Sequence, residues 1–242
     1  MLLKAILLFL VNLVCQFSSH FYGDSFFNRP IVVGSLAGLV LGDLQTGIYV
    51  AAYLELMWVG MIFFAPVNYT NGAVVGVAVA ILSGTTPEVA ATIALAVGLL
   101  GGQIENLSCT LFSVFTSQAP KLAEQGKLDK INQIHIFTGV VQCLMKSAIV
   151  FFAVWLGAEK VGGLMEIMPQ QAMDALTAVG NLLPAVGFGM LLNILWEKKF
   201  LVFYFIGFTV SVYMELPIMA VAVIACCIGI FYFFMTDKEE TA

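Results

Sequence analysis

Long apolar runs alternate with short polar breaks along the chain, and most of the runs have the length of a helix. A helix that crosses a membrane needs about 20 mostly apolar residues. The runs that we assign to spanning helices are residues 3–19, 44–64, 87–116, 136–157, 200–213 and 218–235. The pattern therefore predicts an all-α polytopic membrane protein, a single membrane domain over residues 1–242 with about six spanning helices.

Two segments, 29–73 and 178–195, are apolar but are broken by glycine, proline and polar residues. In the first, only about 12 apolar residues separate Pro30 from Asp43, which is too few to span a membrane. Broken backbone at membrane depth is tolerated only where protein or a water-filled site satisfies its polar groups. We therefore expect both segments to form re-entrant or interrupted helical hairpins that build a transport site.

Residues 117–135 form the longest hydrophilic stretch, and we interpret them as a loop. The stretch contains Lys121, Lys127 and Lys130, three of the ten basic residues. Because basic residues are enriched in cytoplasmic loops, we place it in the cytoplasm. The mixed segment 159–176 is weakly amphipathic and is a candidate for a helix lying along the membrane interface.

The first apolar run, 3–19, has the length and the Lys4 charge of a secretory signal peptide. No clear small-residue cleavage site follows it, so we interpret it as a retained first span. Asn12 and Gln16 are four positions apart and are expected on one face of that helix.

Composition agrees with a membrane protein. The chain is 61% hydrophobic and 10% charged, with a mean hydropathy of +0.99. A soluble domain would have about 25% charged residues. The net charge of −5 comes with no basic patch, so we expect no nucleic-acid partner. The five cysteines lie in apolar runs without metal-ligand spacing, and we expect no disulfide, metal or cofactor.

Glu55 is the most unusual polar residue in the first broken segment, because it interrupts the apolar run AAYLELMWVG. A carboxylate at membrane depth is poorly solvated unless it finds a donor. We interpret Glu55 as an acceptor for a polar substrate or as a proton site, with Trp58 one turn later on the same face. Aromatic faces and carboxylates together suit carbohydrate binding. A polar contact between two helices is the alternative.

Asn68 and Asn71 follow the break at Pro66 and are further candidates for substrate binding. Their amides both donate and accept hydrogen bonds, which suits sugar hydroxyls, although they could equally cap the break. Asp43 is predicted to cap the helix that follows it, and a ligand role is its second interpretation. Glu105 and Lys146 are opposite charges in different apolar runs, and we expect them to pair with each other or with a partner subunit.

The sequence lacks the common catalytic patterns. It has no HExxH, no GxSxG, and no P-loop. The histidines His20 and His135 stand at the ends of apolar runs, without the surroundings of a phosphorylation site. We therefore do not expect this chain to carry an enzymatic activity of its own.

Several stretches together resemble the IIC component of the mannose/fructose/sorbose family of bacterial phosphotransferase systems. They are Arg29-Pro30, Leu39-Val40-Leu41-Gly42-Asp43-x-x-Thr46-Gly47, Leu54-Glu55-Leu56 and Leu183-Pro184-Ala185-Val186-Gly187-Phe188-Gly189. The likeness covers nearly the whole chain. The last stretch looks more like the amino-sugar branch. One departure is Ala65-Pro66-Val67-Asn68, where members often have an Ala-Pro-Asp turn.

The resemblance implies a sugar-translocating subunit in the bacterial cytoplasmic (inner) membrane. It implies a complex with a IID membrane subunit, assembled as a trimer of IIC–IID heterodimers, and an elevator-type movement of hairpins against a scaffold. Cytoplasmic IIA and IIB proteins, phosphorylated on their own histidines, would pass the phosphoryl group to a hexose or hexose derivative. The alternatives are a proton- or sodium-coupled secondary transporter, with Glu55 and Glu105 as carriers, and a non-transporting scaffold.

Overall fold

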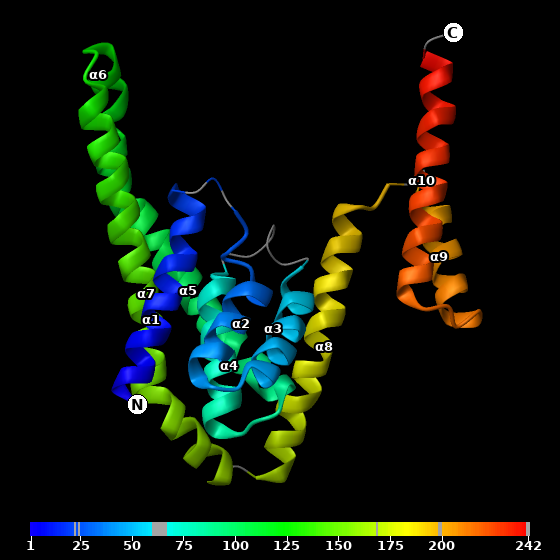
Figure 1. The fold of residues 1–242 in the computed structure, drawn as a ribbon, viewed down its shortest axis with the longest axis horizontal. Helices are drawn as coiled ribbons and strands as arrows, with labels where there is room; N and C mark the ends of the chain where they lie inside the picture. The colour runs from blue at the N-terminus through cyan, green and yellow to red at the C-terminus, as the bar shows by residue number, and fades with distance from the viewer. Residues whose placement is uncertain (22, 24, 60–66, 168, 198–199, 241–242) are drawn as a thin grey trace. The chain divides into compact units, whose positions relative to one another are not determined.

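The protein is almost entirely helical over the residues that the computed structural model describes, which are 1–21, 23, 25–59, 67–167, 169–197 and 200–240. The chain divides into two compact units, Met1–Leu191 and Leu192–Ala242. The helices, coloured along the chain in Figure 1, are α1 (Leu2–Phe21), α2 (Pro30–Leu41), α3 (Leu44–Trp58), α4 (Tyr69–Ser83), α5 (Pro87–Thr116), α6 (Ala119–Glu124), α7 (Leu128–Ile167), α8 (Gln170–Ile194), α9 (Leu201–Tyr213) and α10 (Ile218–Glu240).

Four helical stretches among the described residues are long and apolar enough to cross a membrane. They are Leu2–Phe21, Pro87–Glu124, Leu128–Gly157 and Gln170–Ile194. The shorter apolar helices are Pro30–Leu41, Tyr69–Ser83, Leu201–Tyr213 and Met219–Tyr232. This confirms the all-α membrane architecture, whereas a total of about six spanning helices stays a prediction.

A helical hairpin is present in the segment 29–73, but α2 and α3 form its two arms, and its re-entry into the membrane stays a prediction. Gly42 ends α2 in the left-handed conformation, with a φ of 88°, which a residue without a Cβ adopts without strain. Asp43 then caps α3, because its side chain accepts a hydrogen bond from the Thr46 amide at 3.0 Å. Gly38 and Gly47 let the two helices touch, since a Cβ on Gly38 would lie 2.7 Å from the Cα of Gly47.

The spanning helix predicted over 44–64 is shorter in the structure. Helix α3 ends at Trp58 after 15 residues, and residues 60–64 of the predicted span lie outside the described residues. At about 1.5 Å per residue, such a helix is too short to cross a bilayer alone. Glu55 accordingly lies in the last turn of α3 rather than near the middle of a span.

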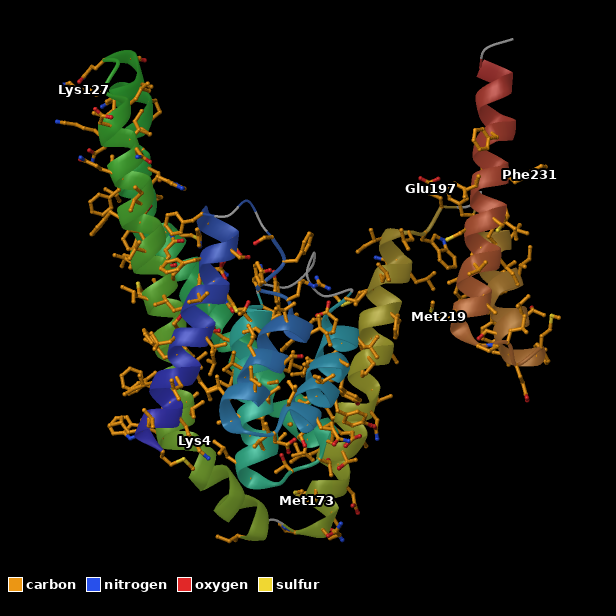
Figure 2. All side chains as sticks on the ribbon, viewed as in Figure 1. Lys4, Lys127, Met173, Glu197, Met219 and Phe231 are labelled. Carbon is orange, nitrogen blue, oxygen red and sulfur yellow. The ribbon has the colours of Figure 1, made fainter. Side chains whose placement is uncertain are left out.

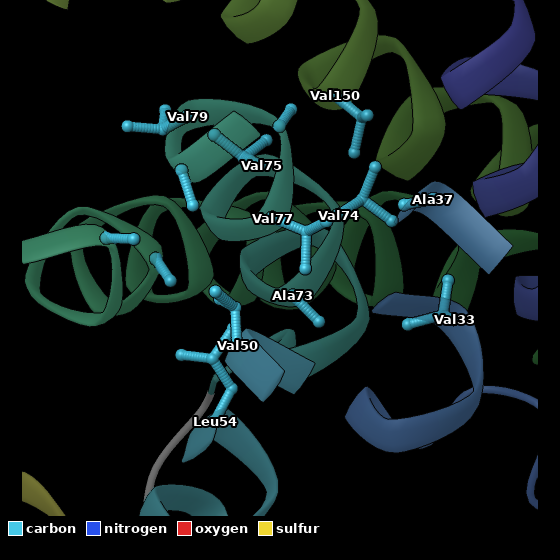
Figure 3. Packing of buried hydrophobic residues seen from close by; sticks show 14 of the residues in the cluster. Val33, Ala37, Val50, Leu54, Ala73, Val74, Val75, Val77, Val79 and Val150 are labelled. Carbon is cyan, nitrogen blue, oxygen red and sulfur yellow. The ribbon is translucent and has the colours of Figure 1, made fainter. Parts of the chain in front are cut away.

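Helix α4 is the centre of the first unit, and every residue from Thr70 to Ala80 is buried. It contacts α1, α2, α3, α5 and α7. Figure 3 shows its valines packed among Val33 of α2, Val50 of α3 and Val150 of α7. A helix that is apolar all round belongs in such a position. Glycines let its neighbours approach closely, since a Cβ on Gly76 would lie 2.8 Å from the Ala94 Cβ of α5.

Helix α5 begins and ends as the sequence predicts, with Pro87 in its first turn and Thr116 as its last residue. The stretch 117–135, however, is not a loop over its whole length. It contains α6 and the first turns of α7, so that α5, α6 and α7 form a long hairpin with Lys127 at its tip (Figure 2). Gly126, in the left-handed conformation, separates α6 from α7, and the polar start of α7 is helical because no glycine or proline lies between residues 127 and 135. The cytoplasmic side of this tip stays a prediction.

The second broken segment, 178–195, is not interrupted but belongs to the continuous helix α8, with Pro184 inside it. Proline lacks an amide hydrogen, so Pro184 cannot bond the carbonyl of Gly180, four positions before it. That carbonyl accepts a hydrogen bond from the Tyr53 hydroxyl of α3 at 2.8 Å. A side chain from another helix thus satisfies the group that the proline frees, and the helix continues. The segment 159–176, expected to lie along the interface, is divided between the end of α7 and the start of α8.

The second unit contains α9 and α10, the terminal helix pair that the sequence predicts around Glu215-Leu216-Pro217. Aromatic rings join the two helices, with Phe203 and Tyr232 centroids 6.2 Å apart. Most of the large apolar side chains described in this pair are exposed, as those of helices in a bilayer are.

We predict that Tyr53→Phe lowers the free energy of unfolding by about 1–3 kcal/mol, because the backbone carbonyl of Gly180 loses its hydrogen-bond donor. The same change in a Pro184→Ala background should cost less, since alanine restores the amide donor within α8. Thermal unfolding of the purified protein measures both effects. The matched control is Tyr49→Phe, because Tyr49 lies on the same helix and its side chain is 64% exposed. Equal losses in both backgrounds would show that the Tyr53 bond does not compensate for Pro184.

Candidate functional site

The first turn of α4 opens into a polar region among the helices of the first unit. Asn68 precedes the helix and caps it, because its side-chain oxygen accepts a hydrogen bond from the Asn71 amide at 3.0 Å. The Asn68 amide itself donates to the Gly98 carbonyl of α5 at 2.9 Å. Gly101 faces Asn68 and Asn71, and its missing Cβ leaves room for both side chains.

Helix α1 contributes two buried amides to the same region. Asn12 donates to the Asn71 Oδ1 and to the Ser147 Oγ, each at 3.0 Å. Gln16 donates to the Asn68 Oδ1 at 3.0 Å and to the Asn71 Oδ1 at 3.3 Å. The prediction that Asn12 and Gln16 share one face of a helix is therefore confirmed. The amide nitrogens of both side chains donate to the first turn of α4.

A salt bridge between Glu105 of α5 and Lys146 of α7 extends the network. The Lys146 Nζ lies 2.6 Å from the Glu105 Oε1, and the other oxygen accepts from Asn68 at 3.2 Å. The Asn71 side chain donates to the Lys146 carbonyl at 3.0 Å. The predicted pairing of these two charges within the chain is confirmed. Four helices, α1, α4, α5 and α7, are thus joined by side-chain hydrogen bonds.

Asn28, in the segment between α1 and α2, closes another side of the region. Its amide nitrogen donates to the Ser19 hydroxyl and to the Tyr69 hydroxyl, each at 2.9 Å. Its backbone carbonyl accepts from the Thr70 hydroxyl at 3.0 Å. These bonds hold the segment against the first turn of α4.

These groups surround a cavity of about 350 Å³. Its volume lies in the range of about 300–1,000 Å³ that is typical of small-molecule sites. Its lining combines amides, hydroxyls and one ion pair with apolar surface. The lining residues are Gln16, Ser19, His20, Asn28, Val67, Asn68, Tyr69, Thr70, Gly102, Glu105, Asn106 and Lys146.

Such a lining can exchange many hydrogen bonds with a polyhydroxylated molecule. Within the described part of the chain, no group of three or more His, Cys, Asp or Glu side chains could hold a metal ion. The chemistry that the cavity offers is therefore hydrogen bonding and charge.

Of the residues predicted to bind substrate, only Asn68 lines this cavity. Asn71 lies behind it, fully buried, and holds the lining in place. Asp43 is at the α2–α3 turn, where it caps α3. The structure thus brings Asn68 and Asn71 together but places Asp43, Glu55 and Trp58 elsewhere.

Glu55 has partners that do not involve the cavity. It forms a salt bridge with Arg29, whose Nε lies 2.8 Å from the Glu55 Oε1. Its second oxygen accepts from the Ile31 amide in the first turn of α2 at 3.1 Å. Glu55 therefore fastens the end of α3 to the start of α2, which is the helix–helix contact that we gave as the alternative. Its role in sugar binding stays a prediction.

Trp58 is 1% exposed and belongs to the hydrophobic core. Its ring occupies the space above Gly72 of α4, where a Cβ would lie 2.5 Å from the ring edge. It also lies 3.5 Å from the position of a Cβ on Gly98. The ring is thus part of the packing between α3, α4 and α5.

Several lining residues were not predicted from the sequence to bind substrate, among them Gln16, His20, Asn28 and Asn106. They come from α1, from the segment before α2 and from α5. The available signal was the presence of amides inside apolar runs, which for Asn12 and Gln16 was visible as a shared helix face. Nothing in the sequence told which distant runs would meet.

We predict unequal costs for the two halves of the ion pair. Lys146 is 3% exposed and Glu105 is 38% exposed. Glu105→Gln leaves a buried ammonium without its partner, which we expect to cost about 3–5 kcal/mol. Lys146→Met should cost less, because water reaches the remaining carboxylate, and the double variant should recover most of the loss. Thermal unfolding of the single and double variants tests this; additive losses in the double variant would contradict it.

Comparison with known proteins agrees with the resemblance. The chain is 27% identical to the mannose-specific EIIC component of Escherichia coli K12 over 243 residues, which cover 98% of this chain and 90% of that protein. It is 25% identical to N-acetylgalactosamine permease IIC component 1 of the same organism, covering 90% and 83%. The sorbose-specific EIIC component of Lacticaseibacillus casei is 26% identical, covering 88% and 79%.

Two solved structures share the fold. One, described as the structure of a membrane protein, matches with a TM-score of 0.84 at 22% identity, covering 96% of this chain and 95% of that chain. The other, from the cryo-EM structure of the mannose transporter ManYZ in complex with microcin E492, matches with a TM-score of 0.55 at 22% identity and the same coverage.

The family described as the sorbose-specific IIC component of the phosphotransferase system matches residues 2–231, almost the entire chain. This chain therefore belongs to that family, the membrane-embedded IIC permease components of bacterial sugar phosphotransferase systems, which reside in the inner membrane.

Proposed function

We propose that this chain is the sugar-translocating subunit of a phosphoenolpyruvate-dependent phosphotransferase system, and that a hexose or hexose derivative binds in the cavity at the first turn of α4. The observation that supports it most directly is this polar cavity among apolar helices. Buried polar groups are costly in a membrane and commonly mark a substrate path. The curated relatives carry the names of mannose, sorbose, fructose and N-acetylgalactosamine systems.

The phosphoryl chemistry lies, in this proposal, on partner proteins. A cytoplasmic IIA protein phosphorylates a histidine of IIB. An oxygen of the bound sugar then attacks that phosphorus, so that an O–P bond forms, the N–P bond to the histidine breaks, and the hydroxyl proton leaves to solvent. This chain supplies the site and the orientation of the sugar.

The proposed partner in the membrane is a IID subunit, and the proposed assembly is a trimer of IIC–IID heterodimers. The first unit is well suited to carry sugar in an elevator-type movement. The hydrogen bonds of Asn12, Gln16, Asn68 and Asn71 and the Glu105–Lys146 bridge tie α1, α4, α5 and α7 into one body. A site built across four joined helices keeps its geometry while the body moves.

Transport assays distinguish the proposed function from an ion-coupled transporter. In cells that express the full set of partner proteins, uptake should require phosphoenolpyruvate-dependent phosphorylation and should deliver sugar phosphate. Uptake is measured with labelled sugar, and the sugar phosphate is separated from the free sugar. Uptake should fall to background when IIB is deleted. Accumulation of free sugar in cells without the phosphotransferase, abolished by an uncoupler, would instead identify a secondary transporter.

Two substitutions locate the sugar. Asn68→Leu removes a cavity group that both donates and accepts, and we expect at least a tenfold loss of sugar affinity in the purified complex.

Glu55→Gln tests the sequence-based prediction for Glu55 by the same measurement of sugar affinity. If Glu55 acts only between α2 and α3, its variant loses thermal stability while its sugar affinity changes less than threefold. A large loss of affinity for Glu55→Gln and none for Asn68→Leu would move the site away from the cavity.

A further inference from the structure

Most of the amides in the wall of the cavity already bind other parts of the protein. The Asn68 Oδ1 accepts a hydrogen bond from Gln16 at 3.0 Å, and the Asn68 nitrogen donates to the Glu105 carboxylate at 3.2 Å. The Asn28 nitrogen donates to the Tyr69 hydroxyl at 2.9 Å. These side chains are therefore held by one another, and their bonds fix the shape of the wall.

Asn106 of α5 differs from these amides. It lines the same cavity, and its side chain forms no hydrogen bond within the described part of the chain. Its backbone carbonyl accepts from the Thr110 hydroxyl at 2.9 Å, and the residue is exposed rather than buried. The two hydrogens on its side-chain nitrogen and the lone pairs of its Oδ1 are therefore available to a ligand.

Helix α5 directs this amide at the cavity. Gly102, Glu105 and Asn106 all line the cavity, and residues three and four positions apart lie on one face of a helix. Gly102 has no side chain, so a ligand can lie against the helix one turn before Asn106. Gln103 is also exposed but is not part of the lining. The face of α5 toward the cavity thus combines an open surface with an uncommitted amide.

The position of Asn106 along α5 makes an uncommitted amide costly. The residue lies within the stretch Pro87–Glu124, which is long and apolar enough to cross a membrane, and Leu107 follows it. A polar side chain within a spanning helix normally faces a partner or a water-filled cavity rather than lipid. Because Asn106 borders the polar cavity, a ligand in that cavity is the partner that its position favours.

We propose that Asn106 binds the sugar directly and determines which sugars are accepted, by holding two neighbouring ring hydroxyls. One hydroxyl donates to the Asn106 Oδ1, and its neighbour accepts from the Asn106 nitrogen. Asn68 and Gln16 are positioning residues, which hold the wall around the ligand. The inference rests on the proposed function, since it requires that sugar binds in this cavity.

The arrangement makes the hydroxyl pattern of the ring the basis of selectivity. A sugar that lacks one of the two hydroxyls loses a hydrogen bond and leaves one group of the amide unpaired. A site built to bind a hydroxyl discriminates against an analogue without it for this reason. Substituents elsewhere on the ring would be sensed less by Asn106.

The experiment is titration calorimetry on the complex of the full chain with its proposed IID subunit in lipid nanodiscs. The probes are D-mannose, D-fructose, L-sorbose, N-acetyl-D-galactosamine and D-glucosamine, followed by analogues of the tightest binder that lack each ring hydroxyl in turn. In the wild type, loss of either of two adjacent hydroxyls should weaken binding about tenfold or more. For a sugar that binds too weakly for calorimetry, the KM of its phosphorylation in cells gives the same comparison.

Asn106→Leu keeps the size of the side chain and removes its hydrogen bonds. It should weaken binding of the parent sugar about tenfold, and it should reduce the penalty for losing either of those two hydroxyls to less than about threefold. Penalties at the other positions should stay as in the wild type. Asn106→Ala is a second variant with the same expected pattern. Such coupling between one side chain and two hydroxyls is a sign of direct contact.

Two further variants serve as references. Asn68→Leu should weaken the parent sugar and all its analogues by a common factor, because Asn68 acts through the wall. Gln103→Leu removes an exposed amide one turn earlier on the same helix, outside the lining, and is the matched control. It should leave the affinity and every hydroxyl penalty unchanged.

The outcomes are distinct. If sugar binds but Asn106→Leu weakens the parent and all analogues equally, or changes nothing, the inference is overturned while the proposed function stands. If the variant instead dissociates the complex in size-exclusion chromatography without changing the hydroxyl penalties, Asn106 contacts a partner subunit, and the inference is again overturned. If none of the five sugars binds and labelled sugar is not phosphorylated in cells, the proposed function and the inference both fail.

Discussion

Polar groups inside a bilayer have almost no water with which to form hydrogen bonds, and this constraint explains most of the polar contacts in the first unit. Its centre is a short helix, α4, whose first turn is buried among the other helices of the unit. The capping side chain of Asn68, the amides of α1 and the Glu105–Lys146 bridge satisfy that end from inside the protein. Without them, the first turn of α4 would leave backbone amides unsatisfied in an apolar surrounding. The site and the fold therefore depend on the same hydrogen bonds.

The same constraint explains how the chain accommodates its other breaks. Gly42 turns α2 back into α3, Asp43 caps the new helix, and Glu55 closes the open end of the hairpin against Arg29 and the Ile31 amide. In α8 the helix continues through Pro184. The Tyr53 hydroxyl replaces the amide that Pro184 lacks, so a segment rich in glycine and proline remains one helix. Glu55 and Tyr53 thus each stabilise a break by a contact with another helix.

We propose that sugar binds in the joined body of α1, α4, α5 and α7. The cavity uses the cap of α4 and the ion pair as part of its wall, so that groups needed for folding also present acceptors to a ligand. The Glu105 carboxylate in this wall also neutralises the buried Lys146 ammonium. Changes at Glu105 should for that reason always be compared with paired changes at Lys146.

The sequence alone determined the class of the protein, because apolar runs of spanning length and few charges admit little else. It also determined local features that depend on neighbours in the chain, such as the Asp43 cap, the Pro87 start of α5 and the shared face of Asn12 and Gln16. Only the tertiary structure decided what Glu55 and Trp58 contact, that α8 is continuous, and which amides meet around Asn68. These outcomes depend on contacts between residues far apart in the chain, and one-dimensional spacing carries no information about which helices become neighbours.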